Sequence, residues 1–114
     1  YILKEIRMKE FPSMDHSKMD YLINIISDVF RVNKNEVRAK NNMREYSEAR
    51  QTLMYIAHVE KKMPLWYIGA YLNWRDHSTV IHACEKIRHG ESEDESIKQE
   101  LILIRERIYN SFDK

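Results

Sequence analysis

The stretch RDHSTVIHACEKIR, residues 75–88, contains an aspartate, two histidines, two hydroxyl side chains and the only cysteine of the chain. Val80, Cys84 and Ile87 recur at intervals of four and three, which places them on one face of a helix. Asp76 precedes this pattern, where an aspartate commonly caps a helix by accepting a backbone N–H bond. The stretch therefore predicts an amphipathic helix that begins at Asp76 and buries Cys84.

The segment before this helix predicts a second, shorter helix and a turn. PLWYIGAYL, residues 64–72, has apolar residues in helical phase and begins with a proline, which the first turn of a helix tolerates. Asn73 and Trp74 follow as a turn, in which asparagine adopts a left-handed conformation at moderate cost. A short helix, a turn and a helix over about residues 76–89 form a helix-turn-helix arrangement.

Three other kinds of chemistry are disfavoured by the same residues. On a helix, His77, His82 and Cys84 point in directions about 140° and 200° apart, so they do not converge on one metal ion. Cys84 shares the apolar stripe, which predicts an inert buried thiol and not a nucleophile. Two isolated glycines cannot build a phosphate-cradling loop. We therefore expect the protein to have no enzymatic activity, no bound metal and no cofactor.

The remaining pattern is also helical, so the predicted fold class is all-α, a small helical bundle containing the helix-turn-helix. One core helix is expected to begin after Asp15 or Ser17, to end near Val32, and to bury a stripe of apolar residues: Met19, Leu22, Ile23, Ile26, Val29 and Phe30. Asn35 is the expected cap of one short turn.

A long helix is expected from Ser47, its cap, to about Lys62. Its inward residues are Ala49, Leu53, Ile56 and Ala57, and its other face carries Arg50, His58 and Lys61. Gly90 is the expected cap ending the helix over residues 76–89. A last helix then reaches about Tyr109 through the apolar residues Leu101, Ile102, Ile104 and Ile108.

Composition indicates one domain. The chain has 114 residues, of which 43% are apolar, and this suffices for a modest core. We divide it into an amino-terminal arm or short helix at residues 1–18 and the domain at residues 19–114. A single cysteine suits a reducing compartment, and no apolar run or signal-peptide pattern indicates a membrane or export, so the cytoplasm is expected.

Charge is unevenly distributed although the net charge is only +1. Residues 31–90 hold eleven Lys or Arg against six Asp or Glu, whereas residues 91–114 hold four against seven. This asymmetry favours an anionic partner near the middle of the chain, and a mixed solvated surface is the alternative explanation. Ser78 and Thr79 lie at a helix amino terminus that favours anions and have the size to contact base edges, and Arg75 is placed to meet a phosphate.

Three motifs carry a family resemblance. RDHSTVIHACEKI at residues 75–87, Ile68–Gly69 and ARQTLMYIA at residues 49–57 together resemble the carboxy-terminal DNA-binding domain of DnaA, the bacterial chromosomal replication initiator. The resemblance extends from about Met19 to Ile108. It implies a helical bundle whose helix-turn-helix binds short asymmetric duplex sites in the replication origin, during the initiation of DNA replication.

The resemblance also implies the contacts with DNA. Base contacts are expected from Asp76, His77, Ser78, Thr79, His82 and Trp66. Phosphate contacts are expected from Lys40, Arg44, Arg50, Gln51 and Arg75. Double-stranded DNA is the expected partner, replication proteins or an upstream ATPase module are possible further partners, and no membrane is involved.

The sequence departs from the family at three places. The family's arginine-rich loop that reaches the minor groove is AKNNMREY here, with Lys40 and Arg44 around two asparagines. Asn73 and Trp74 replace the two glycines usual before RDH, and Trp66 replaces a common proline that touches DNA in the family. We therefore expect a diverged site preference. Residues 1–18 do not resemble the family's connector to its ATPase, so we expect either a free-standing relative or a divergent fragment.

Other interpretations of the same residues remain open at this stage. His82 is also explained as a solvated histidine, Asp76 as a helix cap alone, and Arg50 as an ion-pair partner of Glu45 or Glu48. Trp66 and Trp74 are also explained as core or surface aromatics. The alternative function is a helical protein-interaction module that kept the fold and lost DNA binding, which the thinned basic loop favours.

Overall fold

The computed structural model describes residues 16–112, and within this range the secondary structure is entirely helical. The helices, in chain order, are α2 (Ser17–Phe30), α3 (Lys34–Arg38), α4 (Arg44–Tyr55), the π-helical turn η1 (Ile56–Glu60), α5 (Leu65–Tyr71), α6 (His77–Glu93) and α7 (Glu95–Phe112). The all-α fold class is therefore confirmed. The expected arm or short helix at residues 1–18 lies, except for its last residues, outside the described part.

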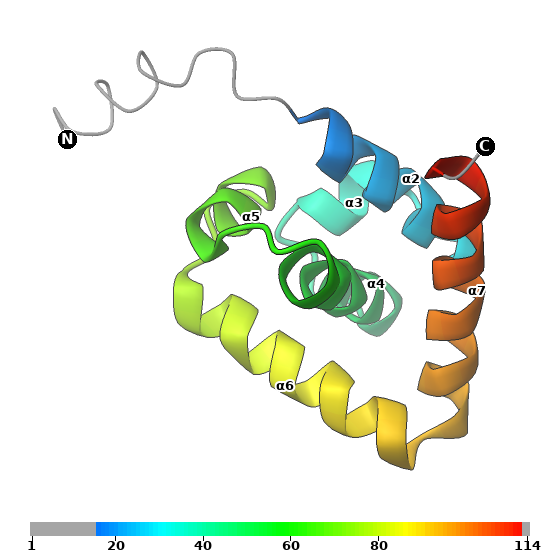
Figure 1. Ribbon diagram of the computed structural model, residues 1–114. Helices are drawn as coiled ribbons and strands as arrows, with labels where there is room; N and C mark the ends of the chain where they lie inside the picture. Colours follow the sequence, from blue (N-terminus) through cyan, green and yellow to red (C-terminus); the bar gives the residue numbers. More distant parts are fainter. Residues whose placement is uncertain (1–15, 113–114) are drawn as a thin grey trace, which may run out of the picture.

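Helix α4 is the centre of the bundle (Figure 1). It packs against α2, α3 and α6, and α7 packs against α2 and α6. The four inward residues predicted for the long helix, from Ala49 to Ala57, are completely buried. The core that positions α6 is therefore built around the apolar face of α4 and η1, two elements that replace the single long helix predicted to about Lys62.

The boundaries of α2 follow from its sequence. Met19, Leu22, Ile23 and Ile26 are buried, and the last apolar residues of the stripe are half-buried at its end. The helix ends at Arg31, whose φ of 59° is left-handed and whose N–H donates to the carbonyls of Asp28 and Ser27. The predicted core stripe is confirmed.

Two predicted helix caps are wrong, because each helix begins at a different residue from the one predicted. Helix α4 begins at Arg44, three residues before Ser47, and the carbonyl of Met43 accepts the first amide bonds. The short helix α3 is capped by Asn33, whose side chain accepts from the N–H of Asn35 at 2.8 Å. Asn35 lies inside the helix that it was expected to cap.

Gly90 does not end α6, which contradicts the prediction. The helix continues to Glu93, and Gly90 is buried because Ile97 of α7 packs directly against it. The break falls at Asp94, whose side chain accepts from the amides of Ser96 and Ile97 and so opens α7. On α7, Leu101, Ile104 and Ile108 are buried, but Ile102 is exposed.

A polar cluster joins the far end of α6 to its neighbours. Arg105 of α7 donates to carboxylate oxygens of Glu60 on η1 and Glu91 on α6. The hydroxyl of Tyr55 donates to Glu91 at 3.1 Å. The Arg105 bonds, with the charge of Arg105 and the Tyr55 bond, outweigh the opposing effect of burial and hold the pKa of Glu91 below its ordinary value. This cluster fixes α7 against α6 at the end opposite the turn.

Candidate nucleic-acid interface

The turn between α5 and α6 is tight and closes on a glycine. Asn73 and Trp74 both have left-handed backbones, with φ of 66° and 62°. The N–H of Arg75 then donates to the carbonyl of Gly69 at 2.9 Å. A Cβ on Gly69 would lie 2.2 Å from the carbonyl oxygen of Arg75, so only glycine permits this approach. The predicted turn is confirmed, and Trp74 shares the conformation expected for Asn73.

Asp76 caps α6 as predicted. Its Oδ1 accepts from the backbone N–H of Thr79 at 3.0 Å, from the Thr79 hydroxyl at 2.6 Å and from the Ser78 hydroxyl at 3.2 Å. These hydrogen bonds lower the pKa of Asp76. The cap fixes the rotamers of both hydroxyl residues and leaves lone pairs on their oxygens to accept from a ligand.

The residues expected to contact bases lie together, with one exception. Asp76, His77, Ser78, Thr79 and His82 are all exposed on the first half of α6. The face opposite them is buried and includes Cys84, whose Sγ donates to the carbonyl of Met54. Trp66 is instead half-buried on α5, with its ring edge-on to Tyr67 at a centroid distance of 6.0 Å.

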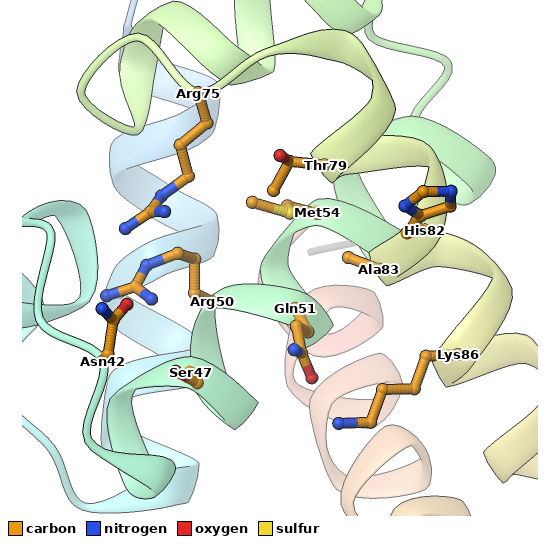
Figure 2. A pocket seen from close by; sticks show the side chains of 10 residues that line it. All are labelled: Asn42, Ser47, Arg50, Gln51, Met54, Arg75, Thr79, His82, Ala83 and Lys86. Atoms are coloured by element: carbon orange, nitrogen blue, oxygen red, sulfur yellow. The ribbon is translucent and has the colours of Figure 1, made fainter.

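A cavity of about 340 Å³ lies between α4 and the exposed half of α6 (Figure 2). It is lined by Asn42, Ser47, Arg50, Gln51, Met54, Arg75, Thr79, His82, Ala83 and Lys86. Three of these described residues are permanent cations, and none carries a carboxyl group. The cavity is therefore a place where an anion is favoured electrostatically.

Arg50 is the residue whose environment differs most from the prediction. We expected its side chain on an outward face, but only 4% of the residue is exposed. Its Nε donates to the carbonyl of Val37 at 2.7 Å, and its Nη2 lies within hydrogen-bond distance of the carbonyls of Glu36, Ala39 and Asn41. Burial, followed by the charge of Arg75, lowers the pKa of Arg50 to about 10. Among the described residues, Arg50 forms no ion pair with Glu45 or Glu48, and Glu48 pairs with Arg44 instead.

Arg75 and Gln51 present polar groups that the described protein does not satisfy. The Nη2 of Arg75 donates to the carbonyl of Ala39 at 3.0 Å, whereas its buried Nε has no hydrogen-bond partner among the described residues. The buried Oε1 of Gln51 likewise has no partner within residues 16–112. Burial lowers the pKa of Arg75. Buried polar groups in this state are costly unless a ligand or water completes them.

The other expected phosphate contacts lie outside the cavity lining. Lys40 is exposed in the loop between α3 and α4. Arg44 is exposed at the start of α4 and pairs with Glu48 at 3.1 Å. Lys86, which lines the cavity, was not among the predicted site residues. Its spacing of seven from Thr79 and four from His82 places it on the same helical face, as the periodicity of the sequence indicated.

Two helices joined by a tight turn, with the second exposing a polar amino-terminal half beside a cationic cavity, define a helix-turn-helix domain of the DNA-binding class. Residues 19–87 match the family described as bacterial dnaA protein helix-turn-helix, and the chain belongs to this family. The family domain is a non-catalytic module that binds DNA boxes in replication origins.

Two bacterial relatives show the extent of the match. The chain is 36% identical over 87 residues to the chromosomal replication initiator protein DnaA of Chloroflexus aurantiacus, a match covering 76% of this chain and 18% of that protein. It is 30% identical over 110 residues to the DnaA of Lachnoclostridium phytofermentans, covering 94% of this chain and 24% of that protein. The chain thus spans a quarter or less of these relatives.

A membrane-spanning element is not found in the described part of the chain. Among residues 16–112, every helix is too short or too polar to cross a bilayer.

Proposed function

We propose that this domain binds double-stranded DNA at specific sequences of the replication-origin type, with the first half of α6 in the major groove. The observation that carries the proposal is the cavity between α4 and α6, which is lined by cations and by no carboxylate among the described residues. It lies beside five exposed polar residues of α6. The dimensions of the major groove admit one α-helix, whose side chains then meet base edges.

The base contacts are assigned to Asp76, His77, Ser78, Thr79 and His82. Because Asp76 holds the hydroxyls of Ser78 and Thr79 in place, their oxygens are preorganised toward a partner. Asp76 serves as cap and as groove-facing acceptor. Trp66 is assigned a contact at the edge of the interface, on α5.

The cavity itself is the proposed seat of a backbone phosphate. The unpartnered Nε of Arg75 and the ammonium group of Lys86 surround it, and Gln51 would donate through its amide nitrogen, since its Oε1 only accepts. A phosphate there would receive charge-assisted hydrogen bonds and would relieve the repulsion between Arg75 and Arg50. Lys40 and Arg44 are assigned to neighbouring phosphates along the same strand.

The target site is proposed to differ from that of typical family members. Trp74 is 52% exposed directly before the recognition helix, where the family usually has a glycine. Trp66 and the loop around Lys40 also differ, and all three lie on elements that flank α6. Replication proteins or an upstream ATPase module are proposed as further partners, and the cytoplasm as the compartment.

Polarisation of a fluorescent duplex, titrated with the protein between about 50 and 200 mM salt, tests this proposal. With phosphate contacts from Lys40, Arg44, Arg75 and Lys86, the logarithm of the affinity should fall with a slope of about −3 to −4 against the logarithm of salt. Lys86→Ala should reduce the slope by about 0.9. Lys98→Ala on α7 is the matched control and should change nothing.

A duplex affinity that is absent, or that does not respond to salt, would refute the proposal. That result would favour the alternative of a helical interaction module that retains the fold.

A further inference from the structure

The geometry points to Arg50 as a positioning residue that fixes the loop of residues 39–43 beside α6, where the corresponding loop of the family reaches DNA. Arg50 acts through the loop and is not itself a phosphate ligand. The inference rests on the proposed duplex binding. It replaces the role in which Arg50 contacts a phosphate directly.

The hydrogen bonds of Arg50 identify what it holds. Four carbonyls at distances of 2.7–3.3 Å surround its Nε and Nη2, and they belong to Glu36, Val37, Ala39 and Asn41. The last carbonyls of a helix have no partners within the helix, and α3 ends at Arg38. The guanidinium therefore caps α3 and the following loop from the side, and its charge suits the negative end of the helix dipole.

Only a guanidinium fits this position. Its nitrogens form a planar fork that spans separated acceptors, whereas a lysine ammonium presents its donors from a single atom. Arg75 adds a second bond to the carbonyl of Ala39 at 3.0 Å. Two arginines from α4 and the α5–α6 turn thus converge on one loop.

Part of the loop of residues 39–43 borders the cavity beside α6. The side chain of Asn41 points inward, donating to Glu36 at 2.7 Å and accepting from the N–H of Met43 at 2.9 Å. Asn42 lines the cavity with Thr79 and His82 (Figure 2), and Lys40 is exposed. When α6 lies in the groove, the adjacent backbone or groove edge therefore meets Lys40 and Asn42.

The charge-conserving substitution Arg50→Lys separates positioning from direct contact. If Arg50 positions the loop, Arg50→Lys releases Lys40 from its phosphate although no charge is lost. The salt slope of duplex binding then falls by about 0.9, equivalent to about an eightfold loss of affinity at 0.1 M salt. Lys40→Ala gives the same loss, and the double variant loses no more than either single variant.

Lys86→Ala is the matched control for this coupling. Lys86 lies on α6 and not on the loop, so its loss adds to that of Arg50→Lys. Hydrogen exchange provides a readout independent of binding. In Arg50→Lys the amides of Ala39 and Met43 exchange faster, while those of the buried half of α6 keep their protection.

The inference is overturned if Arg50→Lys keeps the wild-type slope and Arg50→Met lowers it by about 0.9, because Arg50 is then a phosphate ligand. If Arg50→Lys fails to fold, Asn41→Ala loosens the same loop with Arg50 intact. It should show the same loss of slope, and an unchanged slope overturns the inference. A wild-type protein that binds no duplex refutes the proposed function first, and with it the role of the loop in binding.

Discussion

Gly69→Ala tests whether the close approach of α5 to the turn determines the geometry of the helix-turn-helix. The new Cβ would lie 2.2 Å from the backbone carbonyl oxygen of Arg75. A backbone atom cannot move aside in the way that the end of a flexible side chain can. Overpacking of this kind costs up to about 3 kcal/mol, and the better helix propensity of alanine returns about 1 kcal/mol. The expected net loss is about 2 kcal/mol, or roughly 10 °C in Tm.

Gly90→Ala is the matched control, because the atom closest to its new Cβ is Ile97 Cδ1 at 2.4 Å. That methyl is the end of a flexible side chain, so the control should change stability by less than about 1 kcal/mol. Thermal unfolding followed by circular dichroism measures both variants. Duplex affinity should also fall for Gly69→Ala at temperatures where it is folded, because α6 is displaced from the cavity. A Gly69→Ala protein with wild-type Tm and affinity would refute the reasoning.

Three further predictions concern other parts of the molecule. Trp74→Gly should leave the free energy of unfolding unchanged or raise it by up to about 1 kcal/mol, because the left-handed backbone favours glycine and the Trp74 side chain is half exposed. Trp66→Gly should instead destabilise the protein. Thermal melts compare the two variants. The Arg105–Glu91 bonds should contribute to the stability of the fold above pH 4.5, the ordinary pKa of glutamate, and this contribution should be lost as pH falls through the lowered pKa of Glu91. Glu91→Gln should therefore flatten the dependence of Tm on acid pH. Cys84 should resist thiol reagents in the native state and react on unfolding, because burial protects the thiol and raises its pKa; rapid native labelling would contradict the position of Cys84 in the core.

Helix α6 was predictable because its signals are local. The spacing of Val80, Cys84 and Ile87 fixed which face is buried, and Asp76 caps the helix through atoms only three residues away. The turn at Asn73 was equally local. The exposed residues of α6 follow from the same phase, so most of the candidate base contacts could be placed without a structure.

The burial of Arg50 and its bonds to backbone carbonyls could not be predicted from local pattern. Its carbonyl partners lie 9–14 residues earlier in the chain, and a charged residue is normally expected at the surface. Gly90 was misassigned for a similar reason, since Ile97 of the next helix excludes a side chain there. The cavity is formed by the α3–α4 loop, α4, the turn and α6 together. Such convergence becomes visible only when these segments are packed.

The central claim is tested most directly by selecting bound sequences from a random duplex library with the wild type and with Thr79→Ala, after equal Tm values are established. The wild type should enrich one short motif. Thr79→Ala should lose preference at the base pair that Thr79 contacts, by about 1–3 kcal/mol, and keep its preference elsewhere and its nonspecific affinity. Enrichment of the usual family box without change would contradict the proposed divergence of the site. A folded wild type that enriches no motif would contradict sequence-specific binding itself.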